Sequence, residues 1–208
     1  MTFDLSDPSA KLQIGTWRFN LFDDVSLVAV IERSEVRSPG DYTWFGHLAH
    51  EERSSFILVV KRGVMAANIR VPGKGVYQVG FLGDGVHVVR EVDATGPPSC
   101  GTSSLPSPHT NAFRAQTANP ASCVDDGSRI DVLVVYTSAA RIGAGGTAAI
   151  NAKIQSVIDL STQTYLDSQV KPRLNLVHTA ETVYDEVNRS IDAMFLLLDP
   201  TDGVMDEV

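Results

Sequence analysis

Hydrophobic and polar positions follow a period of two through the first part of the chain. Over residues 16–93, short runs rich in Val, Ile, Phe, Tyr and Trp are separated by turn sequences such as PGKG at residues 72–75. In the run SSFILVVKRG, Phe56, Leu58 and Val60 share one face of an extended strand. About seven such runs predict an antiparallel sheet with one wet face, built as a small sandwich or an open barrel.

The pattern changes after residue 128. The run IDVLVVYT at residues 130–137 is continuously apolar, which is typical of a strand buried on both faces of a parallel sheet. A glycine-rich turn precedes one apolar helical stripe, which consists of Ile150, Ile154, Val157, Ile158 and Tyr165. Pro172 then introduces a second strand-like run over residues 173–184, so a βαβ crossover is predicted. Ser190 is a candidate cap for a further helix over residues 190–198.

Composition marks the boundary between the two patterns. Residues 96–127 contain five prolines and many Ser, Thr and Ala, without apolar periodicity. We therefore predict an α+β chain with a β-rich domain over residues 1–95, an extended linker over 96–128 and a β-α-β-α unit over 129–208. Two parallel strands form a small sheet, so the last unit is expected to be incomplete and prone to self-association when made alone.

Charge and hydropathy narrow the range of partners. The 208 residues carry a formal net charge of −8 and no cluster of Lys and Arg, which disfavours nucleic acid as a partner. No apolar stretch approaches the roughly 18 residues of a membrane span, so no membrane partner is predicted. The first residues, MTFDLSDPSAKLQIGTW, lack a basic region followed by an apolar one, and no export signal is visible in them.

Two local motifs invite a functional interpretation. GAGGTA at residues 143–148 matches the G-x-G-x-x-A pattern of dinucleotide sites, but it lies well past the end of the strand at Thr137. A glycine turn that leads into a helix explains the same letters. His47 and His50 are three residues apart, which places them on opposite sides of a strand, so they are expected to be ordinary histidines and not zinc ligands. His178 is expected to pack or to form a hydrogen bond within its strand.

Three segments carry a family resemblance. IDVLVVYTSAARIGAGGTAAINAKIQSVID, RLNLVHTAETVYDE and DGVMDEV together resemble the start of the catalytic domain of bacterial metzincin zinc endopeptidases, the reprolysin-like and peptidyl-Asp metallopeptidase group. YTWFGHL and SSFILVVKRGVMAANIRV resemble the propeptide in front of that domain. The resemblance implies a secreted hydrolase of protein or peptide substrates that is made as an inactive zymogen.

The family binds zinc with H-E-x-x-H-x-x-G-x-x-H, in which three histidines hold the metal and the glutamate is the general base. This motif does not occur in the sequence, and the resemblance places the zinc helix after Val208. We therefore assign no catalytic or metal-binding residue, expect no cofactor in this chain, and expect it to be inactive alone. Its expected partner is the remainder of the catalytic domain.

Cys100 and Cys123 are the two cysteines, and both lie in the predicted linker. In an exported precursor they are candidates for a disulfide, which stabilises by about 3 kcal/mol for a loop of this length. A cysteine beside Pro and Gly at the end of a propeptide also resembles the cysteine switch of some metzincins, in which a thiolate occupies the open zinc position. Alternatively, both thiols are free and have no function.

Two further functions stay open at this point. In the first, the β-rich module acts without chemistry: it binds and masks a peptidase domain, its own or another copy's, as a folding aid or inhibitor. In the second, the α/β unit binds a nucleotide through GAGGTA.

Overall fold

The computed structural model describes residues 15–93 and 127–185, together with residues 193, 195–197, 199 and 201–205. Cys100, Cys123 and nearly all of the predicted linker lie outside the described residues. The same holds for part of the predicted helix over residues 190–198, of which residues 193 and 195–197 are helical.

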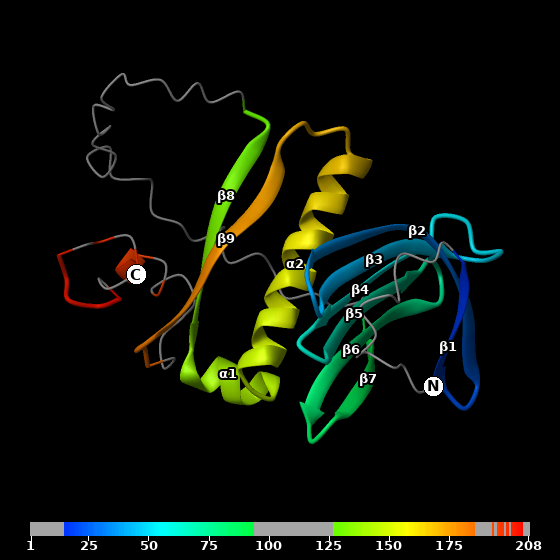
Figure 1. Cartoon of the computed structure of the whole chain (residues 1–208), viewed down its shortest axis with the longest axis horizontal. Helices are drawn as coiled ribbons and strands as arrows, with labels where there is room; N and C mark the ends of the chain where they lie inside the picture. Colours follow the sequence, from blue (N-terminus) through cyan, green and yellow to red (C-terminus); the bar gives the residue numbers. More distant parts are fainter. Residues whose placement is uncertain are drawn as a thin grey trace.

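The first region folds into one antiparallel sheet of seven strands, each paired with its neighbours in sequence. The strands are β1 (Thr16–Phe22), β2 (Val25–Ser38), β3 (Asp41–Leu48), β4 (Ser55–Lys61), β5 (Val64–Val71), β6 (Gly75–Gly83) and β7 (Val86–Val92). The predicted antiparallel sheet is thus confirmed. The sheet is single and curls into a half-barrel, so the sandwich alternative is wrong (Figure 1).

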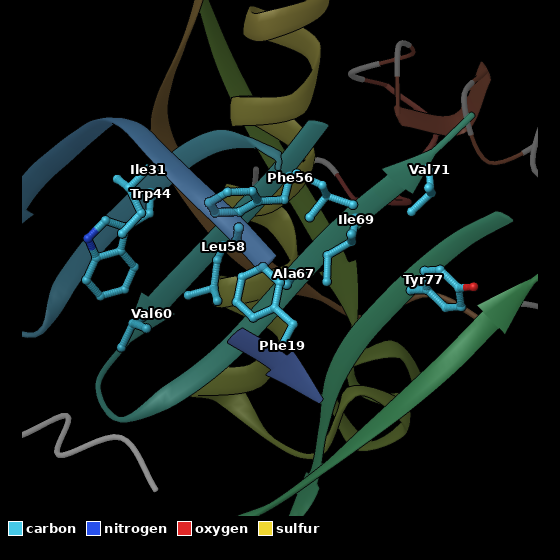
Figure 2. Packing of buried hydrophobic residues seen from close by; sticks show 12 residues of the cluster. Phe19, Ile31, Trp44, Phe56, Leu58, Val60, Ala67, Ile69, Val71 and Tyr77 are labelled. Atoms are coloured by element: carbon cyan, nitrogen blue, oxygen red, sulfur yellow. The ribbon is translucent and has the colours of Figure 1, made fainter. Parts of the chain in front are cut away.

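The inner face of the curl holds the main core. Phe56, Leu58 and Val60 of β4 are buried there, as their alternation predicts. Aromatic rings bridge the curl: Trp17 and Trp44 meet edge to face at 4.8 Å, and Phe19 and Phe56 at 5.3 Å. Figure 2 shows the buried side chains of this core, with Phe19 of β1 beside Leu58 of β4 and Ala67 of β5. A single curled sheet therefore encloses its own core.

The second region is a βαβ unit. β8 (Arg129–Thr137) and β9 (Arg173–Thr182) pair in parallel, and α1 (Ser138–Ala144) and α2 (Thr147–Asp167) lie between them in sequence. The predicted crossover is confirmed, whereas the short helix α1 had not been predicted. Thr137 ends β8 and caps α1, because its side chain accepts a hydrogen bond of 3.0 Å from the Ala140 amide.

Helix α2 lies between the two sheets (Figure 1). Ile150, Ile154 and Ile158 form its buried aliphatic side and pack against β8 and β9. Burial of β8 on both faces was predicted, but in the described structure only the side toward α2 is packed, and Leu133 is 44% exposed. None of the helices described here has the length and apolarity to cross a membrane.

Candidate functional site at the interface of the sheet and helix α2

The side of α2 opposite its isoleucines contacts the outer face of the seven-stranded sheet. The residues that make this contact are spaced alternately three and four apart, which keeps them on one side of a helix. We call them the docking stripe: Ala149, Ala152, Ser156, Asp159 and Gln163. Their partners on the sheet form the docking face: Arg33, Arg37, Thr43, Val64, Ala66 and Asn68.

Small side chains bring the helix close to the sheet at the start of the stripe. Ala149 and Ala152 form a buried cluster with Val64 and Ala66 of β5. Next to this cluster, Gly145 lies at the corner between α1 and α2, where a Cβ atom would lie 3.1 Å from Cδ1 of Phe81. The absence of large side chains here allows the backbones to approach, and Ala152, which is fully buried, is the most tightly enclosed member of the cluster.

A buried carboxylate forms the centre of the interface. Thr43 Oγ1 donates a hydrogen bond of 2.6 Å to Asp159 Oδ2, and Gln155 Nε2 donates one of 2.8 Å to Asp159 Oδ1. Thr43 is 0% exposed and Asp159 is 6% exposed. Arg37 Nη1 lies 3.6 Å from Asp159 Oδ2 and supplies the opposite charge. The carboxylate of the helix is therefore satisfied mainly by groups of the sheet.

Arg37 links this carboxylate to a second one on the sheet. Its Nη2 donates to Thr43 Oγ1 at 2.9 Å, and its Nε donates to Asp41 Oδ1 at 2.8 Å. Lys61 Nζ donates to the other oxygen of Asp41, also at 2.8 Å. Arg37 is thus held by two groups of the sheet, Asp41 and Thr43, in addition to the charge of Asp159 on the helix.

The far end of the stripe is held by a second arginine. The Arg33 guanidinium lies 3.7 Å from the centre of the Phe45 ring and donates a 3.1 Å hydrogen bond to Gln163 Oε1. Burial lowers the pKa of Arg33, and the charge of Asp159 opposes that shift. One turn before Asp159 on the stripe, Asn68 Nδ2 of β5 donates to Ser156 Oγ at 3.0 Å. Polar contacts therefore follow more than half of the docking stripe.

The histidines considered from the sequence do not meet at one site. His47 Nδ1 lies 2.9 Å from Glu32 Oε1, so this ring is paired with a carboxylate. His178 lies in β9 with an exposed side chain, and the expectation that it packs within its strand is wrong. A bulge shifts the register of β9 beside His178, between the pairs of Val132 and Leu133. No group of three or more His, Cys, Asp or Glu residues that could hold a metal occurs in the part of the chain described.

GAGGTA forms the corner between α1 and α2. Gly145 ends α1 in the left-handed conformation, and its amide donates to Ile142 O, while the Gly146 amide donates to Arg141 O at 2.9 Å. These amides are therefore used within the helix end. The glycine turn predicted from the sequence is present at the position expected.

The docking stripe was missed by sequence reasoning. Only the apolar repeat of α2 had been considered, and Ala, Ser, Asp and Gln do not appear in such a repeat. The signal that would have revealed it is a second line of small and polar residues at the same helical spacing, half a turn away from the isoleucines.

Comparison of the chain with protein-family models, with curated proteins and with solved structures finds no match. The functional interpretation therefore depends on the contacts described above and on the sequence resemblance.

Proposed function

We propose that this chain is the precursor region of a secreted, metzincin-type zinc endopeptidase. In this proposal the sheet β1–β7 is the propeptide-like module, and β8–α1–α2–β9 is the start of the catalytic domain. The module holds α2 in place and has no chemistry of its own. The observation that carries this role is the buried contact between Thr43 on the sheet and Asp159 on the helix.

The energetics of α2 support a holding role. Among the described residues, its isoleucines pack on a sheet of two parallel strands, and a sheet of two strands is marginal in water. The docking face covers the opposite side of the helix, so α2 is stabilised from both sides while the parallel sheet is still small. A module of this kind favours folding of the catalytic domain.

The substrate, the cofactor and the cellular location follow from the family proposal alone. A completed enzyme would bind zinc through H-E-x-x-H-x-x-G-x-x-H, hydrolyse protein or peptide substrates and act outside the cell. Cys100 and Cys123 stay candidates for a disulfide or a cysteine switch, with two free thiols as the alternative. The remainder of the catalytic domain is the proposed partner.

The coding sequence after the Val208 codon tests the family proposal. We expect an in-frame H-E-x-x-H-x-x-G-x-x-H downstream, and the protein made from the extended frame should bind one zinc ion and cleave casein. An extended product without the motif, zinc or activity would refute the endopeptidase. It would leave the second candidate, in which the module acts without chemistry and binds and masks a peptidase domain as a folding aid or inhibitor. The Thr43–Asp159 contact supports that role equally.

A further inference from the structure

The contacts of the docking face define what kind of partner it accepts. We infer that this face is a receptor for a helix that carries the docking stripe, and that it binds the same stripe on a second copy of this chain when its own helix is displaced. The inference depends on the proposed holding role of the module, and it adds the identity of the partner and the features that select it.

Shape is the first feature that selects the helix. Ala152 is 0% exposed and packs against Val64 and Ala66, so this position of the stripe has no space for a larger residue. Gly145 imposes a similar limit at the corner before the helix, beside Phe81. A helix with large side chains at these positions would be rejected.

Charge is the second feature. Arg37 and Thr43 of the sheet converge on one carboxylate of the helix, that of Asp159. Asp159 lies seven residues after Ala152, and a separation of seven residues, about two turns, returns to the same side of a helix. The partner is therefore a helix with small residues in its first turns and an aspartate two turns further on.

Connectivity allows the same contact between two chains. The helix and the face belong to parts of the chain that are separated by residues 94–126, which number 33. Because the helix and the face belong to one chain, the chain's own helix has a high effective concentration at the face. The internal helix therefore competes strongly, and a second copy binds well only after that competition is removed.

Two variants of this 208-residue chain remove the competition, one at the face and one at the stripe. Ala66→Trp blocks the face and leaves the stripe intact, whereas Ala152→Trp blocks the stripe and leaves the face intact. Each variant alone should be monomeric by sedimentation, and their mixture should form a one-to-one complex. Wild type should bind Ala66→Trp on the order of 100-fold more weakly than Ala152→Trp does, because its own helix occupies the face. Val86→Trp, at an exposed position outside the interface, is the matched control.

If a tryptophan variant does not fold, charged substitutions at Thr43 and Asp159 give a second test. Thr43→Asp places a carboxylate against Asp159 and should release the wild-type helix, and Asp159→Lys should do the same beside Arg37. In one chain the two changes should restore protection of α2 from hydrogen exchange. In separate chains, the face with Thr43→Asp should bind the stripe with Asp159→Lys at least tenfold more tightly than it binds the wild-type stripe.

The outcomes separate the inference from the family proposal. Folded partner variants that do not associate in either pair would overturn the receptor inference, whatever the downstream gene encodes. A chain that carries both Ala66→Trp and Ala152→Trp has neither a free face nor a free stripe, so it should bind neither single variant. Binding of either single variant to it would also overturn the inference, because contacts elsewhere would then be responsible. A missing zinc motif downstream would refute the endopeptidase and leave the binding result unaffected.

Discussion

Replacement of Thr43 by Val is the sharpest test of the interface. The two side chains have nearly the same shape, so the change removes one hydroxyl from a fully buried position without leaving a cavity. That hydroxyl donates at 2.6 Å to Asp159 and accepts at 2.9 Å from Arg37. The substitution therefore removes one hydrogen bond from a buried carboxylate oxygen and one from the Arg37 guanidinium, while every apolar contact is kept.

The expected cost follows from these two bonds. A hydrogen bond to a charged group contributes roughly 1.5–3 kcal/mol, and a buried group left unsatisfied costs a similar amount. Because Gln155 still donates to Asp159 and Asp41 still accepts from Arg37, we expect about 2–3 kcal/mol in total. At 1.4 kcal/mol per factor of ten, the docking equilibrium should weaken by roughly 30- to 150-fold.

Native-state hydrogen exchange measures this change directly. Protection of the α2 amides should fall by that factor in Thr43→Val, while the amides of β4 and β5 keep their wild-type protection. Thr16→Val, at an exposed position of β1, is the matched control and should change neither set. A double-mutant cycle with Asp159→Asn should show coupling between the two sites. Protection of α2 within twofold of wild type in Thr43→Val would refute the role assigned to the contact.

Two further predictions concern the module itself. His87 Nε2 accepts a hydrogen bond of 2.9 Å from the Met65 amide, which requires a neutral ring, and burial lowers the pKa of His87 below its ordinary value. The folded pKa of His87 lies below the unfolded one, so its contribution to stability is complete above about pH 6.5 and declines as the pH falls toward the folded pKa. The urea midpoint should therefore fall less between pH 7.5 and 5 in His87→Gln than in wild type. An equal fall of the midpoint in both proteins would contradict this. Gly46→Ala should destabilise by about 3 kcal/mol or more, because its Cβ would lie 2.0 Å from Val30 O. Gly80→Ala, whose Cβ would have no neighbour within 4 Å, is its control in thermal unfolding, and equal melting temperatures for the two variants would refute the steric argument.

The sequence predicted which faces of the elements are buried better than how those elements assemble. The alternation of Phe56, Leu58 and Val60 correctly assigned the inner face of β4, because the side chains of a strand alternate with a period of two. The other face was predicted to be wet, which is wrong at β4, because Ile57 and Val59 are buried there on the side of the sheet that helix α2 covers. The choice between two packed sheets and one curled sheet depends on contacts across the curl, such as that of Trp17 with Trp44. No local pattern contains that information.

Helix α2 shows the same limit of prediction from local sequence patterns. Its isoleucine side was predicted and is buried against the parallel strands. Val157 was assigned to that side, yet it is 54% exposed, because it lies on the flank of a helix that two sheets hold from opposite sides. The docking stripe carries only a weak apolar signal, from Ala149 and Ala152, and its central contact is a carboxylate that needs Thr43, a residue 116 positions earlier in the chain.

The pairing of every strand in the sheet with its sequence neighbours has a consequence during synthesis. Contacts of short sequence separation form early, and individual hairpins close in roughly 1–10 μs. Translation at roughly 5–20 residues per second needs several seconds to advance from Asp93 to Asp159. The hairpins of the sheet therefore have time to close before the ribosome has made the helix that docks on them.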